Sequence, residues 1–368
     1  MEIIRTGDES DYENIAFSTV PAGIKESHAY SGGVLLRDGR VVFVPLDART
    51  VGIFDPAKSE YSTVAGEFPY GAYYGGVLLR DGRVLFVPCS AKTIGIFDPA
   101  TNEYSTVPGV SVKGSYSGGV LLRDGRVLFV PCNTTAIGIF DPTTNVYREI
   151  PGQWGPYAYW GGVLLPDGRV VFVPSHAKQV GVFDPATDAL SHIPRPRMQC
   201  IGAYTGGMLL RDGRVMFVPL GAEPIVFDPT TNECSEIPIV EEPEPYVGGV
   251  MLADGRAVLL PHVTNNIGIF DPTTNSLRAF PSGPGVSGTY SSGVLLPNGN
   301  VVLVPWDTEN IGILTLSEEK ALARARARSL ARTEAVKEEL VAAAWRPKRM
   351  AEWCLDTEER RELADRWC

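Results

Sequence analysis

The chain has 368 residues, of which 44% are apolar and 21% charged, and its net charge is −10. This composition is typical of a soluble globular protein. The negative charge argues against a broad nucleic-acid-binding surface, because such surfaces are rich in Lys and Arg. No apolar run approaches the roughly 18 residues of a membrane span, and the acidic start of the chain lacks the apolar region of a signal peptide. We therefore expect a cytoplasmic or nuclear protein that does not bind a membrane.

A repeated pattern follows a lead segment of residues 1–15. Seven segments share the pattern Tyr-x-Gly-Gly-Val-Leu-Leu-x-Asp-Gly-Arg-Val-x-Phe-Val-Pro with small variations, and they lie 42 to 45 residues apart. A unit of this length is typical of a β-propeller blade. The segments begin at Tyr30, Tyr73, Tyr116, Tyr159, Tyr204, Tyr246 and Tyr290.

Each repeat predicts four short strands, which we call a, b, c and d in chain order. Strand a ends at Asp-Gly, a strong hairpin signal, and strand b ends at a proline, which cannot donate a further ladder hydrogen bond. Strand c ends at Asp-Pro, a turn opener, and strand d is a short piece such as residues 104–107. Strand b is apolar on both sides, as in residues 41–44, which indicates sheets covered on both faces. A β-sandwich would expose one face, so the pattern favours a propeller.

The glycine pair of strand a and the tyrosine that opens each repeat have predicted structural roles. Glycine allows close backbone approach, which the innermost strands of a propeller need. We expect the tyrosines to lie between blades with their hydroxyl groups bonded to the backbone. A ring of tyrosines that stacks on a ligand is the alternative.

The two ends of the repeat array predict how the ring closes. The last repeat has strands a, b and c, but residues 314–316 replace the usual Phe-Asp-Pro and no strand d follows. Residues 16–21 resemble strand d of the second repeat. We therefore predict an all-β fold, a seven-bladed propeller with four-stranded blades over residues 16–316, whose last blade is completed by strand 16–21.

Residues 317–368 have a different composition, rich in Ala, Leu, Arg and Glu, which favour helices. Trp345, Trp353 and Trp367 lie in this segment. We predict a helical C-terminal extension that docks on the rim of its own propeller or on a partner.

Two sequence resemblances bear on family. Residues 165–173 and 182–187 resemble kelch and galactose-oxidase-type repeats, and the resemblance covers residues 16–316. Kelch repeats place a glycine pair at the end of the second strand, whereas this chain has it in the first. The resemblance implies a role in protein recognition. Residues 344–353 resemble C-terminal segments in proteins of large DNA viruses of algae and amoebae, which implies a structural component of a virus particle as an alternative.

The candidate chemical motifs favour structural interpretations. Arg-Asp-Gly-Arg occurs in four repeats and its Asp-Gly-Arg part in six of the seven, whereas one active site would need only one copy. Asp-Pro-Thr-Thr-Asn at 141–145 lacks the distant bidentate acid of a calcium loop. His176 and His262, with a third ligand from Asp47, Glu223 or Asp307, are the alternative of a metal site. We expect no metal, no cofactor and no catalytic residue.

The repeats differ most in the b–c loops, which share one face with the d–a connections because strand direction alternates. Loops carry function on rigid scaffolds, and a binding surface must break the sevenfold symmetry. We expect the tryptophans of this face to be exposed and a small loop residue such as Ala48 to tolerate substitution. The predicted partner-binding residues are Asp47, Arg49, Lys92, Asn133, Trp154, Trp160, His176, Lys178, Glu223, His262, Asn265, Trp306 and Asp307.

The sequence thus predicts a non-enzymatic protein-interaction or assembly module that binds a protein partner through its b–c/d–a face. An enzyme or small-ligand binder with a site at the channel mouth is the alternative from another class.

Overall fold

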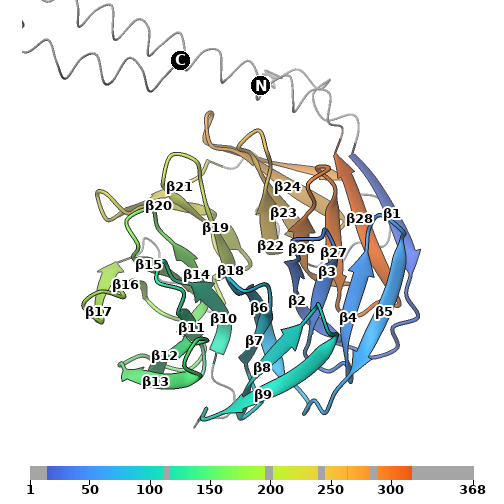
Figure 1. The fold of residues 1–368 in the computed structure, drawn as a ribbon. Coiled ribbons are helices and arrows are strands. Elements are labelled where there is room, and N and C mark those ends of the chain that lie inside the picture. The colour runs from blue at the N-terminus through green and yellow to red at the C-terminus, as the bar shows by residue number, and fades with distance from the viewer. Residues whose placement is uncertain are drawn as a thin grey trace, which may run out of the picture. The chain divides into compact units, whose positions relative to one another are not determined.

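The structure is a computed structural model in which the strands form seven separate four-stranded antiparallel sheets (Figure 1). The predicted lead segment up to residue 14 and the predicted helical extension 317–368 lie outside the described residues. The structure describes residues 15–110, 116–194, 202–238, 245–262, 264–281 and 289–316.

Six blades are built from consecutive strands. Blade 1 contains β2 (Tyr30–Leu35), β3 (Val41–Pro45), β4 (Thr50–Asp55) and β5 (Glu60–Ala65). Blade 2 contains β6 (Tyr73–Leu78), β7 (Val84–Pro88), β8 (Thr93–Asp98) and β9 (Glu103–Pro108). Blade 3 contains β10 (Tyr116–Leu121), β11 (Val127–Pro131), β12 (Ala136–Asp141) and β13 (Val146–Pro151). Blade 4 contains β14 (Tyr159–Leu164), β15 (Val170–Pro174), β16 (Gln179–Asp184) and β17 (Ala189–Pro194).

The remaining blades complete the ring. Blade 5 contains β18 (Tyr204–Leu209), β19 (Val215–Pro219), β20 (Ile225–Asp228) and β21 (Glu233–Glu236). Blade 6 contains β22 (Tyr246–Met251), β23 (Ala257–Pro261), β24 (Asn266–Asp271) and β25 (Ser276–Pro281). Blade 7 contains β26 (Tyr290–Leu295), β27 (Val301–Pro305), β28 (Asn310–Leu316) and, from the other end of the chain, β1 (Ile15–Pro21).

The first strand of every blade contacts the first strand of the next, and β26 contacts β2, so the ring is closed. β1 pairs antiparallel with β28, from Ile15 opposite Leu316 to Pro21 opposite Asn310. Figure 1 shows this blue strand beside the orange β28. The predicted propeller and its closure by the N-terminal strand are therefore confirmed, with β1 starting one residue earlier than expected.

The core lies between neighbouring blades. The second strand of each blade is buried along its whole length, as the two-sided apolar pattern predicts. Val34 and Val42 of blade 1 pack in one cluster with Tyr73 and Phe86 of blade 2. This face-to-face packing excludes the β-sandwich.

Close approach of the inner strands explains the glycine pair of strand a. A Cβ atom on Gly33 would lie 2.5 Å from Cγ2 of Val294 and 2.8 Å from Cγ2 of Val304, both in blade 7. A Cβ atom on Gly32 would lie 3.3 Å from the Cα atom of Gly75 in blade 2. Larger residues here would push the blades apart.

The seven repeated tyrosines are at most 4% exposed, so the ligand-stacking alternative is wrong. Each lies between two blades, as predicted. The prediction that their hydroxyl groups bond the backbone is wrong for most of them, because their partners are side chains. The hydroxyl of Tyr30 lies 2.6 Å from the hydroxyl of Tyr61, a strand d residue of its own blade. Tyr73 makes the same contact with Tyr104, whereas Tyr204 does bond a backbone carbonyl. A pair of hydroxyl groups satisfies both partners inside the blade.

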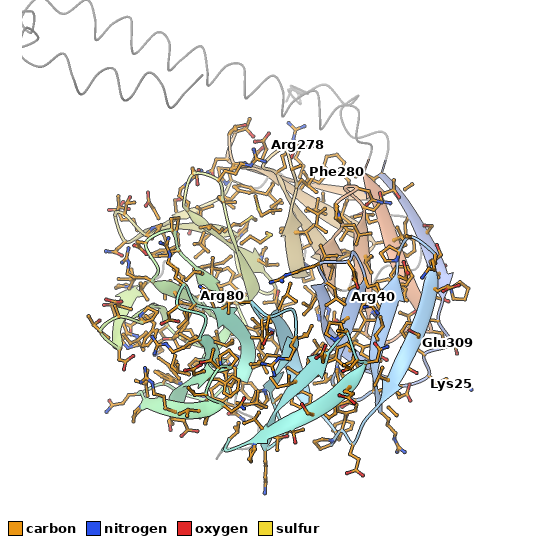
Figure 2. All side chains as sticks on the ribbon, in the orientation of Figure 1. Lys25, Arg40, Arg80, Arg278, Phe280 and Glu309 are labelled. Carbon is orange, nitrogen blue, oxygen red and sulfur yellow. The ribbon has the colours of Figure 1, made fainter. Side chains whose placement is uncertain are left out.

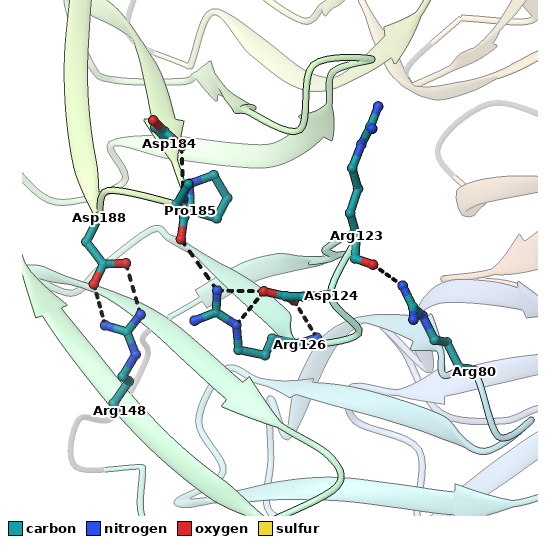
Figure 3. A network of polar contacts seen from close by, with 9 residues as sticks. Arg80, Arg123, Asp124, Arg126, Arg148, Asp184, Pro185 and Asp188 are labelled. Atoms are coloured by element: carbon teal, nitrogen blue, oxygen red, sulfur yellow. Dashed lines mark hydrogen bonds and ion pairs between the residues drawn. The ribbon is translucent and has the colours of Figure 1, made fainter.

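The a–b turns connect successive blades (Figure 3). The guanidinium of Arg80 donates to the carbonyl of Arg123 in the next blade, and Arg37 and Arg211 make equivalent bonds. The second arginine of the motif, Arg126, bonds Asp124 within its turn and the carbonyl of Pro185 in the next blade. The Arg-Asp-Gly-Arg motif is therefore structural, as predicted. These a–b turns and the c–d turns form what we call the turn face.

Candidate functional site

The b–c loops and the d–a connections lie together at the opposite ends of the strands, and we call this surface the loop face. The first residue of strand a pairs with the last residue of strand b, as Tyr30 does with Pro45, so both loop types meet there. The backbone N–H groups of Ala22 and Ile24 donate to the carbonyl of Glu309. Figure 2 shows Lys25 and Glu309 close together at one edge of the propeller.

The b–c loops of blades 1, 2 and 3 are fixed to the core at their third position, where Ala48, Ala91 and Thr134 are buried. Ala48 is 2% exposed and packs in the cluster that contains Tyr30 and Ile311, and Ala91 is equally buried. The backbone N–H of Ala48 donates to the carbonyl of Ala29. The expectation that Ala48 tolerates substitution is therefore wrong, because this small residue fills space between blades.

The fourth loop position carries an exposed cation in three blades. Arg49, Lys92 and Lys178, from blades 1, 2 and 4, are exposed. Among the described residues, none of these three side chains has an ion-pair or hydrogen-bond partner. The same position is acidic in blades 5 and 7, at Glu223 and Glu309.

Other predicted partner-binding residues also reach this surface. Asn133, His262 and Asn265 are exposed, and His176 is half-buried beside Tyr157, with ring centroids 5.4 Å apart. No group of three His, Cys, Asp or Glu side chains arranged to hold a metal ion is found among the described residues, so the metal-site alternative at His176 and His262 gains no support.

The three predicted tryptophans are half-buried rather than exposed. Nε1 of Trp154 donates to the carbonyl of Thr134 at 2.5 Å, and its ring packs on Tyr159. Trp160 lies in the inner strand β14 and not in a loop. Its ring meets Tyr74 of blade 2 at a centroid distance of 5.2 Å, so the two rings from blades 4 and 2 contact one another in the centre of the ring.

A polar cluster joins blades 7, 1 and 2 on the loop face. Asp307 accepts hydrogen bonds from the Ser27 hydroxyl at 2.5 Å and from the backbone N–H of His28 at 2.9 Å. Asp47 accepts one from the N–H of Gly71 at 2.7 Å. The imidazole of His28 lies between the two acids, with Nδ1 3.7 Å from Asp47 and Nε2 3.8 Å from Asp307. Asp47 and Asp307 thus hold the start of the next blade.

Trp306 packs on His28 with the two ring centroids 4.8 Å apart, and it is the last member of this cluster. Sequence reasoning missed His28, although a signal exists in the repeats. Two residues before the repeated tyrosine, most blades have glycine, as at Gly71 and Gly202, and both have positive φ. His28 and Tyr157 occupy this position with φ of 53° and 54°. Non-glycine residues in this conformation are uncommon and often mark functional sites.

Cys89 and Cys132 begin the b–c loops of blades 2 and 3, and both are free thiols. Burial raises the pKa of the Cys132 thiol to about 12, with a smaller contribution from Cys89. Burial also raises the pKa of Cys89. Because the thiolate is the reactive form, neither is prepared to act as a nucleophile at neutral pH.

Two of the most exposed large apolar side chains of the described residues belong to the loop face. Tyr70 is 79% exposed and Tyr157 is 47% exposed, whereas Val146, at 57%, begins an outer strand after a c–d turn. The negative charge of Asp47 raises the pKa of the Tyr70 hydroxyl, which places Tyr70 beside the polar cluster. No helix in the described part of the chain is long and apolar enough to span a membrane.

Comparisons with known proteins identify the fold. No family model and no curated protein matches the sequence. Virginiamycin B lyase from Staphylococcus aureus is similar in structure, with a TM-score of 0.73 and 16% identity over 83% of this chain and 100% of the lyase. A streptogramin B lyase gives a TM-score of 0.72 and 18% identity over 83% of this chain and 99% of that chain. The WD40 propeller domain of Doa1 gives a TM-score of 0.62 and 12% identity, over 83% of this chain and 98% of that domain.

These similarities confirm the seven-bladed β-propeller and no finer family. The kelch part of the sequence resemblance is not confirmed, because the solved structures described above are lyases and a WD40 propeller. The viral resemblance of the C-terminal segment has no support from these comparisons. One further solved structure holds a catalytically inactive His-to-Ala variant of the virginiamycin lyase with quinupristin.

Proposed function

We propose that this protein is a non-enzymatic binding module that recognises a protein partner through its loop face. The contrast between its two faces carries the proposal. On the turn face, arginines such as Arg80 and Arg126 bond the neighbouring blade, so their binding capacity is used within the fold. On the loop face, Arg49, Lys92 and Lys178 are exposed with no partner among the described residues.

Exposed aromatic side chains support the same surface. Tyrosine is enriched among the residues that dominate interface energies, and Tyr70 and Tyr157 are the exposed tyrosines of the loop face among the residues that the structure describes. Buried core tyrosines such as Tyr30 have no such role, because they cannot reach a partner. We therefore replace Trp154 and Trp160 by Tyr70 and Tyr157 as the expected aromatic contacts.

Affinity capture from the native source with the full chain tests this function. We expect Tyr70→Ala with Tyr157→Ala to reduce capture of specific partners at least about tenfold, because aromatic contacts of this kind are worth about 2 kcal/mol or more. Val146→Ala is the matched control, since Val146 is also exposed but lies outside the loop face. Loss of capture with Trp345→Ala and Trp353→Ala, with the tyrosine variant unaffected, would move the contact to the C-terminal extension.

An enzyme is the second candidate, and His28 is the observation that favours it. An imidazole held between two carboxylates can accept a proton as a general base, and the fold is shared with lyases. If this candidate is correct, the protein converts a small molecule such as quinupristin, and His28→Gln abolishes the conversion while His192→Gln, on an outer strand, does not. Chromatography of the reaction mixture measures this. Equal activity of the two variants would exclude His28 as the base.

A further inference from the structure

We propose that the occupant of the loop face is an acidic, aromatic-containing polypeptide segment, bound over blades 1 to 4, with its charged contacts in blades 1, 2 and 4. This proposal rests on the proposed function and adds the chemistry of the partner. Two independent properties of the described residues coincide there: exposed cations without partners and exposed aromatic rings.

The cations are distributed unevenly around the ring. Arg49, Lys92 and Lys178 occupy the equivalent fourth loop position in blades 1, 2 and 4, and each is exposed. Exposed cations elsewhere on the propeller differ in this respect: Lys58 is paired with Asp55 at 2.9 Å and Arg148 with Asp188 at 2.9 Å, whereas Lys25 and Arg278 have no ion-pair partner among the described residues. A cation that no neighbour neutralises attracts a negatively charged partner and steers its approach.

The aromatic rings belong to the same blades. Tyr70 precedes blade 2 and Tyr157 precedes blade 4, so each lies in a d–a connection next to a loop that carries one of these cations. The Tyr70 hydroxyl itself lies beside the acid Asp47. The two rings therefore offer apolar contact area, and the cations of the neighbouring loops offer the sites for a carboxylate. A segment that alternates acidic and aromatic side chains would use both.

The remaining loop positions favour a polypeptide over a nucleic acid. The same position is acidic at Glu223 and Glu309 in blades 5 and 7, and the polar cluster adds Asp307. A nucleic acid following the ring would meet these acids, and the chain as a whole has a net charge of −10. Nucleic-acid affinity depends on many simultaneous phosphate contacts, which three cations do not supply.

Fluorescence anisotropy with the full chain tests the proposal. The probe is a labelled peptide of glutamate, tyrosine and glycine, compared with the same peptide carrying lysine for glutamate and with a single-stranded DNA of equal charge. The test variant is Arg49→Glu with Lys92→Glu. Its control, Lys58→Glu with Arg278→Glu, makes the same change of charge at exposed positions outside the loop face.

We expect the acidic peptide to bind, the lysine peptide not to bind, and the affinity to fall as salt screens the contact. The loop-face variant should lose at least tenfold in affinity and the control less than threefold. No binding of the acidic peptide, equal loss in both variants, or tighter binding of the DNA would overturn the proposal.

The partners captured from the native source separate this proposal from the proposed function. Capture that fails with the Tyr70 and Tyr157 substitutions but persists after Arg49→Glu with Lys92→Glu would leave a loop-face module whose partner is not acidic. Capture unaffected by every loop-face substitution would contradict the proposed function itself.

Discussion

Ala48 illustrates how residues of one loop divide between fold and function. It lies between Asp47 and Arg49, and it is 2% exposed while Arg49 is exposed. Asp47 bonds the backbone of Gly71 in the next blade. Within three consecutive residues, one holds the neighbouring blade, one fills the core and one remains accessible to a partner.

Substitution at Ala48 tests this division. Ala48→Val inserts two methyl groups into a closely packed cluster, and we expect the free energy of unfolding to fall by about 1–3 kcal/mol. Arg49→Ala, one residue further, should change it by less than about 0.5 kcal/mol. Urea denaturation followed by circular dichroism measures both values. Similar effects of the two substitutions would show that the loop is not anchored at its third position.

Strand β1 is the element that completes blade 7. It pairs with β28 over its whole length, and Phe17 and Ile15 pack against the cluster of blades 6 and 7. The Phe17 ring lies 6.2 Å from the ring of Tyr290. Because β1 and β28 come from opposite ends of the repeat array, this pairing links the two ends within one blade.

Deletion of residues 1–22 should therefore leave β28 with an unpaired edge. Exposed edge strands pair with other chains, so we expect oligomers or insoluble protein. Deletion of residues 1–14 is the control, since it retains β1. Size-exclusion chromatography separates the outcomes. A monomer with an unchanged melting temperature after the longer deletion would contradict the role of β1.

Stability of the whole ring depends on contacts repeated between every pair of blades. The buried tyrosines contribute to all seven interfaces, and burial raises the pKa of Tyr159 and of Tyr290 to about 12. Burial also raises the pKa values of Tyr30 and Tyr73 above the ordinary value of 10.0. The folded state therefore retains phenol protons that the unfolded chain loses.

This difference predicts alkaline unfolding. Above pH 10 the unfolded state binds fewer protons than the folded state, so the free energy of unfolding falls as pH rises. We expect unfolding between about pH 10 and 12, with tyrosinate absorbance rising together with the loss of the circular dichroism signal. Complete ionisation of the core tyrosines in a protein that keeps its folded spectrum would contradict the burial described here.

The sequence alone determined the propeller, because each blade repeats the same local signals. Two-sided apolar strands, Asp-Gly turns and a glycine pair depend on neighbours within one repeat and the next. The missing fourth strand of the last repeat and the similar segment at residues 16–21 also predicted the closure. The structural role of the repeated arginines followed from their recurrence, since a motif that recurs in most blades serves the fold and not one site.

Only the tertiary structure decided which loop residues reach solvent. Trp154 and Trp160 looked like surface residues because they lie near loops, yet one bonds Thr134 and the other packs on Tyr74 of another blade. Ala48 looked tolerant for the same reason. Tyr70 lies beside Asp47, and His28 lies between Asp47 and Asp307. These acids belong to b–c loops that are distant in the sequence or in another blade. The burial of these loop residues depends on which residues of other blades lie beside them in the closed ring. The sequence of one repeat does not show which residues those are.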